Sequence, residues 1–144
     1  METRQCGSCG AMTMTLATRD LSEQYKGETI TIAAMPGWYC DVCGESEFLT
    51  SEDADRFSRE TTAAMERIDA QFAAFVRATR KRLGLKQSEA AALFGGGVNA
   101  FSEYERGLRK PSKATLLLLK ILGHHPELLQ EIKAAWPCLK RNRI

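Results

Sequence analysis

Four cysteines form two short motifs near the start of this chain of 144 residues, first Cys6 and Cys9, then Cys40 and Cys43. Both motifs read C-x2-C, 30 residues separate them, and a glycine directly follows the second cysteine of each. Two such turns supply four thiolates, the tetrahedral ligand set that a zinc ion prefers. The glycines permit the positive φ with which a backbone wraps around the sulfurs. The spacing therefore predicts one bound Zn²⁺ per chain.

The predicted zinc ion has a structural role, because four thiolates leave no open position for a water or a substrate. A segment of about 50 residues buries too little apolar surface to fold well without such a staple. A rubredoxin-like iron centre in an electron carrier uses similar turns and remains the alternative. No other cluster of catalytic residue types is evident, so we do not expect an enzyme. The fifth cysteine, Cys138, is expected to be an incidental thiol.

The residues between the two cysteine motifs predict a small antiparallel sheet. Residues 12–17 and 28–34 alternate polar and apolar side chains with period two, as half-buried strands do. Lys26-Gly27 lies on the turn side of the second run. Pro36-Gly37 is expected to turn the chain toward the second cysteine motif. The first part of the chain should therefore be a zinc-bound unit built on a hairpin.

The rest of the chain has the spacing and punctuation of helices. Thr50 and Ser51 suit a helix N-terminus, and no Gly or Pro interrupts the residues that follow, so a linker between the first two helices would be stiff. Glycines and prolines then separate shorter segments. The helices are expected at residues 52–68, 72–83, 87–94, 98–105, 113–122 and 126–135. The predicted fold is α+β, with a zinc-bound domain at residues 1–69 and an all-α, five-helix domain at residues 70–144.

Charge divides the chain at the same place. Residues 1–69 contain 6 basic and 13 acidic side chains, a formal charge of −7, whereas residues 70–144 contain 14 basic and 5 acidic ones, a formal charge of +9. The basic half is typical of a domain that binds nucleic acid, and the acidic half favours a basic partner. No apolar run is long enough to span a membrane and no export signal is present, so we expect a cytoplasmic protein.

A helix-turn-helix pattern begins at Gln87. Counting from that residue, a small side chain is needed at position 5, a turn glycine at position 9, and apolar side chains at positions 15 and 18. Ala91, Gly95, Phe101 and Tyr104 occupy those positions. The alternative is an ordinary helical hairpin, but basic charge, glycine placement and periodicity all agree with the motif.

The second helix of such a motif enters the major groove of DNA. With Val98, Phe101 and Tyr104 facing inward, the outward side chains include an Asn that can pair with adenine and a Glu that can accept from cytosine. Flanking polar and basic side chains should bind phosphates. Glu105 is expected to be a structural hydrogen-bonding partner. The expected DNA contacts are Asn99, Ser102, Glu103, Arg106, Gln87, Lys86, Arg109 and Lys110.

Aliphatic residues are more numerous after residue 115 than one small core can use. They include residues 116–119, Ile121 and Leu122. The surplus predicts a homodimer interface in the C-terminal domain, which a palindromic operator would require.

Four segments give the chain a family resemblance. They are WYCDVCGE at residues 38–45, FGGGVNAFS at residues 94–102, YERG at residues 104–107 and HPELL at residues 125–129. With them, nearly the whole chain resembles the MqsA-type antitoxins of bacterial type II toxin–antitoxin systems, which combine a YgiT-type zinc finger with an Xre-like helix-turn-helix.

The resemblance implies that the zinc domain neutralises a cognate toxin, typically an mRNA-cleaving ribonuclease. It also implies that the C-terminal domain dimerises and represses its own operon by binding a palindromic operator. The four cysteines match the family's zinc ligands, and Asn99 matches its base-reading Asn. Two departures stand out: Glu103 replaces an Arg that reads guanine in the family pattern, and the linker contains no Pro. The alternative is a stand-alone, zinc-containing helix-turn-helix regulator without a toxin partner.

Overall fold

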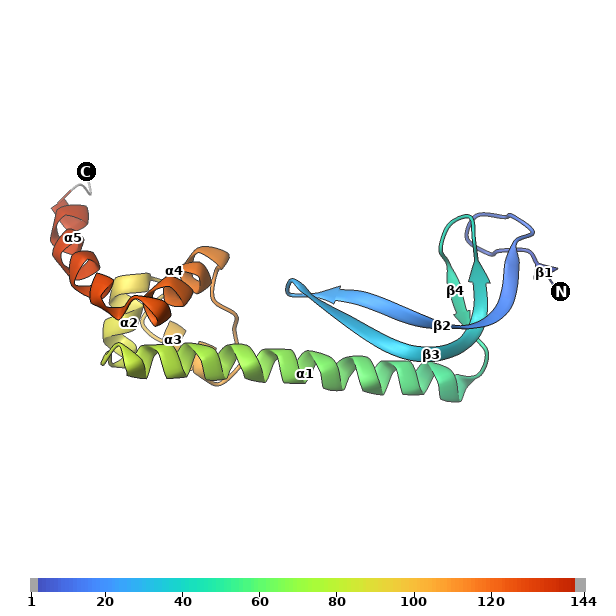
Figure 1. Cartoon of the computed structure of the whole chain (residues 1–144), viewed down its shortest axis with the longest axis horizontal. Helices are drawn as coiled ribbons and strands as arrows, with labels where there is room; N and C mark the ends of the chain where they lie inside the picture. The colour runs from blue at the N-terminus through green and yellow to red at the C-terminus, as the bar shows by residue number, and fades with distance from the viewer. Residues whose placement is uncertain (1–2, 142–144) are drawn as a thin grey trace. The chain divides into compact units, whose positions relative to one another are not determined.

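A computed structural model describes residues 3–141, with side chains described up to residue 137. The expectation for Cys138 falls outside the described side chains. The chain forms two compact units, Met1–Arg67 and Ile68–Ile144. The first contains a four-stranded sheet and the second contains short helices, so the predicted α+β architecture is confirmed (Figure 1). Among the described residues, none of the helices has the length and apolarity that crossing a membrane requires.

The sheet of the first unit is antiparallel, with strand order β1-β2-β3-β4. Strands β2 (Met14–Tyr25) and β3 (Glu28–Cys40) form a long, curved hairpin, and the short strands β1 (Thr3–Arg4) and β4 (Ser46–Phe48) flank one end of it (Figure 1). Both predicted strands exist but extend much further than their alternating segments. The extension matters because it carries β3 directly into the second cysteine motif.

The hairpin turn lies at the predicted place. Tyr25 pairs with Glu28, which leaves Lys26 and Gly27 as a two-residue loop with φ of 52° and 88°. Positive φ at both central positions is the signature of the type I′ turn, whose twist matches that of the flanking strands.

The prediction that Pro36-Gly37 turns the chain is wrong, because both residues lie inside β3. Pro36 pairs with Thr18 on one side only, since the pairing of β4 begins at Gly37. A strand edge tolerates a proline, which has no N–H to donate. Gly37 is buried, and a Cβ there would lie 2.6 Å from the carbonyl oxygen of Glu47. The glycine thus permits close approach of β3 and β4.

A β-bulge interrupts the hairpin at Asp20. Arg19 pairs with Met35 and Leu21 pairs with Ile32, so Asp20 faces two residues, Ala33 and Ala34. The Asp20 carboxylate accepts a hydrogen bond from the N–H of Ala34, which has a φ of 53°. The extra residue shifts the alternation of β3, which buries Ile30 and Ile32 before the bulge and Met35 and Tyr39 after it.

Helix α1 (Ser51–Arg82) begins where Thr50 accepts a hydrogen bond from the N–H of Asp53. The two helices expected at residues 52–68 and 72–83 are therefore one continuous helix, which crosses from the first unit into the second. No Gly or Pro interrupts this stretch, and this explains the continuity. Within the first unit, Arg56 donates hydrogen bonds to the carbonyl oxygens of Ala33 and Ala34 and so ties α1 to the bulge.

The second unit adds four α-helices and a 3-10 turn. Helix α2 has the predicted bounds. Helix α3 begins two residues later than predicted, and α4 passes through Gly123 where an end was expected. Gly123 packs against Thr79, where even a Cβ would lie at an ordinary contact distance of 3.8 Å. The elements are α2 (Gln87–Phe94), α3 (Ala100–Glu105), α4 (Lys113–His124), η1 (Pro126–Leu128) and α5 (Leu129–Arg141).

One hydrophobic core holds these helices together. Its most deeply buried members come from α1, α2, α3 and α4, and Leu129 at the start of α5 completes it. Phe101 lies at its centre with no exposed surface, and its ring contacts those of Phe94 and Tyr104. Such a core, shared by every helix, fixes α2 and α3 relative to each other.

Candidate metal centre and nucleic-acid interface

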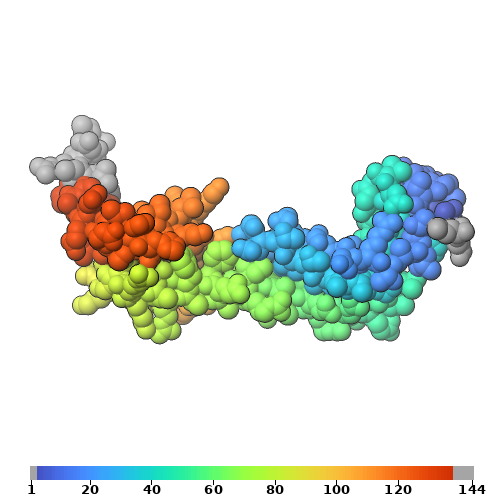
Figure 2. All heavy atoms as spheres, viewed as in Figure 1, coloured from blue at the N-terminus to red at the C-terminus, as the bar shows by residue number. Residues whose placement is uncertain are grey.

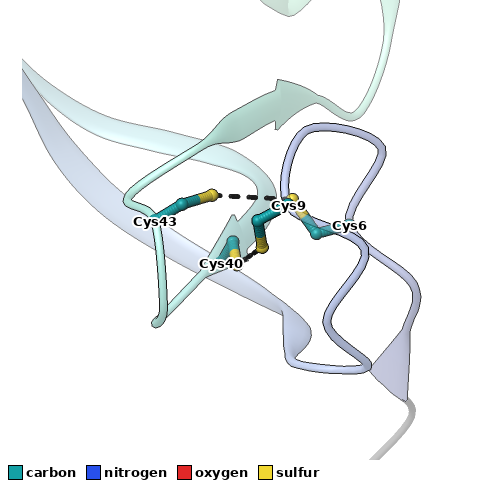
Figure 3. A group of neighbouring side chains, drawn as sticks. All are labelled: Cys6, Cys9, Cys40 and Cys43. Carbon is teal, nitrogen blue, oxygen red and sulfur yellow. Dashed lines mark hydrogen bonds between the residues drawn. The ribbon is translucent and has the colours of Figure 1, made fainter.

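The four predicted metal ligands meet at one end of the sheet (Figure 3). All four Sγ atoms lie within 4.8 Å of one another, and the Cys6–Cys43 and Cys9–Cys40 pairs are each 3.7 Å apart. A tetrahedral ion with bonds of about 2.3 Å to sulfur places its ligands about 3.8 Å apart. The cluster therefore has the size and donor type for one thiolate-bound metal ion.

Two loops with the same backbone structure present these sulfurs. In the first, the N–H of Gly10 donates to the Cys6 carbonyl over 2.9 Å, and in the second, the N–H of Gly44 donates to the Cys40 carbonyl over 3.0 Å. Both glycines have a φ of 77°. In Figure 2 the atoms of the two loops, blue and cyan, lie side by side at the surface. The glycine signal in the sequence thus corresponds to a repeated metal-binding turn.

Within each loop the two cysteines differ in exposure. Cys6 and Cys40 are buried, and Cys9 and Cys43 are exposed. The buried pair packs with Met14 and with Trp38 in a small apolar cluster. Each loop therefore anchors one ligand in the sheet and presents the other toward solvent.

The thiols interact strongly with one another and with the backbone. A hydrogen bond from the Thr13 hydroxyl, and then one from the backbone of Cys43, lower the pKa of Cys40 to about 6. A hydrogen bond with the backbone of Glu45 lowers the pKa of Cys43. Desolvation and the neighbouring thiols outweigh this bond and raise the pKa of Cys43 to about 12. Four sulfurs this close cannot all ionise without a cation, so the set fits a metal ion.

Two arginines flank the candidate metal centre, and no sequence pattern predicted their positions. Arg4 lies 4.6 Å from the Trp38 ring centroid and pairs with Glu47. Arg19 lies 4.9 Å from the Tyr39 ring centroid and pairs with Asp41 over 2.9 Å. Thr13, the hydrogen-bond partner of Cys40, was also missed, since a lone threonine in an alternating strand carries no signal.

In the second unit, α2 and α3 form the predicted helix-turn-helix. Ala91, Phe101 and Tyr104 are buried, as the motif requires. The N–H of Gly95 closes α2 by donating to the Ala91 carbonyl, and Gly95 has a φ of 80°. The expectation that Val98 faces the core is wrong, because its side chain is 79% exposed. Val98 precedes the first turn of α3, so helical periodicity does not apply to it.

The candidate DNA contacts all lie on or beside these two helices. Asn99 is exposed and occupies the N-cap position of α3. Arg106, Lys86, Gln87 and Arg109 are exposed, whereas Ser102, Glu103 and Lys110 are half-buried. Several already have partners within the unit: Gln87 donates to Glu105 over 3.1 Å, Arg109 pairs with Glu103 over 3.3 Å, and Lys110 lies 4.5 Å from the Phe72 ring centroid.

Glu105 has the structural role expected from the sequence. Its side chain is 5% exposed and accepts hydrogen bonds from the guanidinium of Arg80, which is 13% exposed. Burial alone raises the pKa of Glu105, but the hydrogen bonds from Arg80 and Gln87 and the nearby positive charges lower it below its ordinary value. The hydrogen bond with Glu105 raises the pKa of Arg80. This buried ion pair fixes the end of α1 against α3.

The fold and the cysteine cluster together define a sheet unit with a candidate metal site, followed by a unit with a helix-turn-helix arrangement. The family model described as "Antitoxin component of bacterial toxin-antitoxin system, MqsA" matches residues 4–133. The chain is 37% identical over 131 residues to antitoxin MqsA of Escherichia coli strain K12, which covers 90% of this chain and 99% of that protein. The chain therefore belongs to the MqsA antitoxin family, and the resemblance stated from the sequence is confirmed.

A solved structure adds a comparison for the first unit. The N-terminal domain of E. coli MqsA is 24% identical, covers 46% of this chain and 98% of its own, and has a TM-score of 0.42.

Proposed function

We propose that this chain is a cytoplasmic antitoxin that neutralises a cognate toxin through residues 1–69 and represses its own operon through residues 70–144. The observation that carries the proposal is the family match over residues 4–133, which spans both the cysteine cluster and the helix-turn-helix. In this proposal the chain is not an enzyme, and its two units bind two different partners.

Zinc is the proposed metal, with one ion per chain bound by Cys6, Cys9, Cys40 and Cys43. Four cysteine sulfurs at tetrahedral spacing form a closed set of soft ligands, which is the ligand set of structural zinc sites. When bound, the ion would supply structural cross-linking of the two loops. Metal analysis of the purified chain tests this, and iron in place of zinc would support the electron-carrier alternative.

The proposed toxin-binding surface lies around this centre. The first unit is acidic, with a formal charge of −7 over residues 1–69, which complements the basic surface of a small ribonuclease. Large apolar side chains are also exposed near the cysteine motifs, as expected for a protein interface. They are Met12, Leu16, Val42, Phe48 and Leu49.

Co-expression tests the antitoxin function most directly. The frame next to this gene would be expressed with and without the chain, and growth and copurification would be measured. A small basic protein that arrests growth alone, and copurifies with the chain, supports the proposal. Absence of any such frame, and of any small basic protein in pull-downs, supports a stand-alone regulator instead.

Operator binding would use α3 as the recognition helix and Asn99 as its adenine reader. The C-terminal unit would dimerise through its exposed aliphatic side chains, of which Leu117 and Ile121 lie one helical turn apart on α4 with exposures of 52% and 50%. Dimerisation would match the two-fold symmetry of a palindromic operator.

The Asn99→Ala variant tests this placement of the recognition helix. We expect operator affinity to fall by about 1–3 kcal/mol for each lost bidentate contact, with relaxed preference at one position in each half-site. Binding would be measured by fluorescence anisotropy on a duplex that the wild-type chain selects from a random pool. Unchanged affinity and unchanged preference would show that another residue reads the base.

A further inference from the structure

One guanidinium joins three parts of the helix-turn-helix. Arg109 lies in the segment between α3 and α4, and its Nη2 donates to the carbonyl oxygen of Gly96 over 2.6 Å. The same nitrogen lies 3.4 Å from the Tyr104 hydroxyl, and the guanidinium carbon lies 5.1 Å from the Tyr104 ring centroid. Its Nη1 pairs with the Glu103 carboxylate over 3.3 Å. Arg109 therefore contacts the turn and two successive residues of α3.

The turn that Arg109 contacts consists of three consecutive glycines. Gly95, Gly96 and Gly97 have φ values of 80°, 95° and 100°, which only glycine adopts without strain. Three consecutive glycines have high conformational freedom when nothing holds them. Within the described residues, the backbone bonds at this turn come at its ends, from Gly95 to Ala91 and from Ala100 to Gly97. The carbonyl of the middle glycine is held by Arg109.

The middle glycine packs closely against α3. A Cβ at Gly96 would lie 2.6 Å from the Tyr104 hydroxyl, 2.9 Å from the Ala100 Cβ and 3.4 Å from Arg109 Nη2, so the turn must stay close to α3 for Arg109 to reach it. A lysine cannot reproduce the arrangement, because only the planar guanidinium can donate in several directions while it lies against an aromatic ring. The adjacent Lys110 differs, since its ammonium lies near the Phe72 ring instead.

Glu103 is the second partner in this arrangement. It stands on α3 with a side chain that is 33% exposed, and its charge is offset by Arg109. An unpaired carboxylate at this position would repel DNA phosphates. The ion pair reduces that repulsion and engages one of the two carboxylate oxygens of Glu103.

We propose that Arg109 is a positioning residue for sequence-specific DNA recognition, which holds the triple-glycine turn against α3 so that Asn99 is presented to a base edge. Glu103 anchors Arg109 and is not itself a base reader, and Arg109 is not a phosphate contact. The inference rests on the proposed operator binding. It differs from the sequence expectation, which assigned Arg109 to phosphate and Glu103 to a base.

The test compares Arg109→Ala, Arg109→Lys and Glu103→Gln in the full, metal-loaded chain. Anisotropy would give the affinity of each variant for the wild-type-selected duplex and for a random duplex of equal length, at several KCl concentrations. We expect both Arg109 variants to lose about 10-fold on the selected duplex, within the range produced by one lost base contact. In Arg109→Lys, which keeps the positive charge beside Glu103, the affinity for the random duplex and the slope of log affinity against log salt should stay close to the wild-type values. Glu103→Gln should show a smaller loss of the same kind.

Lys86→Ala is the matched control, because Lys86 is an exposed basic residue expected to contact phosphate. The substitution should lower the affinity for both duplexes equally. It should also reduce the slope of log affinity against log salt by about 0.9, the value for one released counterion. The proposal would be overturned if Arg109→Ala lowered the affinity for both duplexes equally and reduced the salt slope, while Arg109→Lys kept the wild-type affinities and slope. The ratio of the two affinities distinguishes a loss of specificity from a loss of stability, because partial unfolding lowers the affinity for both duplexes equally. If the wild-type chain selects no duplex, the proposed operator binding itself fails.

Discussion

The two units of the chain are stabilised by different means. Among its described residues, the second has a hydrophobic core of eleven buried residues, nine from the five α-helices and two, Leu83 and Leu85, from the segment between α1 and α2. In the first, the buried cluster beside the cysteines consists of Cys6, Met14 and Cys40, with Trp38 packed against it. Two of its three buried members are candidate metal ligands, and β3 also buries Ile30, Ile32, Met35 and Tyr39. The comparison teaches that the proposed metal site is part of the packing of the first unit, whereas apolar side chains alone form the core of the second.

Substitution of a buried cysteine of the candidate metal site should produce the largest difference in stability between the two units. Cys40→Ser removes one of four sulfurs, and loss of metal binding forfeits a folding contribution of about 10–16 kcal/mol for a structural zinc ion. We expect the first unit to lose its sheet signals in NMR spectra while the helix-turn-helix signals persist. Ser8→Ala, an exposed change in the first loop, is the control and should leave both sets intact. Loss of both sets in Cys40→Ser would show that the units fold together.

A substitution in the core of the second unit should have the opposite effect, because it destabilises the second unit and leaves the first intact. Phe101→Ala removes a fully buried ring and should destabilise that unit by about 3–5 kcal/mol, because the cavity cannot collapse completely. Thermal unfolding followed by helical circular dichroism would measure it, and the metal content should remain at the wild-type value. A variant that also releases its metal would contradict the independence of the two units.

The buried ion pair offers a further test in the second unit. Arg80→Met leaves the Glu105 carboxylate buried without its main partner, and the expected cost is about 3 kcal/mol. The double variant Arg80→Met with Glu105→Gln should recover part of that loss. A double variant no more stable than Arg80→Met would show that the residual charge is not the cause.

The same pair predicts a dependence of stability on pH. Because the folded-state pKa of Glu105 is lowered, its contribution is fully present above the unfolded pKa of about 4.3 and is lost as the pH falls through the folded value. Denaturant unfolding between about pH 6 and about pH 3, roughly 1.5 units either side of the unfolded pKa, would measure it. Glu105→Gln should flatten this part of the profile.

The smallest expected effect concerns the close strand approach in the first unit. Gly37→Ala forces a Cβ against the backbone of Glu47, and overpacking of this kind costs about 1–3 kcal/mol. The midpoint for metal release by a chelator should shift to lower chelator concentration. Gly27→Ala, at the exposed hairpin turn, serves as the comparison, since nothing lies near its Cβ and only its positive φ is strained.

Local patterns in the sequence were enough to predict that the four cysteines meet, that glycine turns stand beside them and that α2 forms. These features depend on residue type and short spacing, which a sequence displays directly. The strand position of Gly37 depends on the approach of β4, and the exposure of Val98 depends on where α3 begins after three glycines. The contacts of Arg109 join residues from three segments. No local pattern carries such information, so these features needed the structure.

We expect a metal ion to maintain the fold of the proposed toxin-binding unit, while the proposed DNA-binding unit stays folded without it. The most direct measurement is to strip the metal from the full chain with a chelator and to measure binding of the cognate toxin and of the selected duplex in the same sample. We predict that toxin binding is lost and that added zinc restores it. Because the core of the second unit stays intact, duplex affinity should stay within about threefold of the metal-loaded value. Toxin binding that survives complete metal removal, or duplex binding that disappears with the metal, would contradict it.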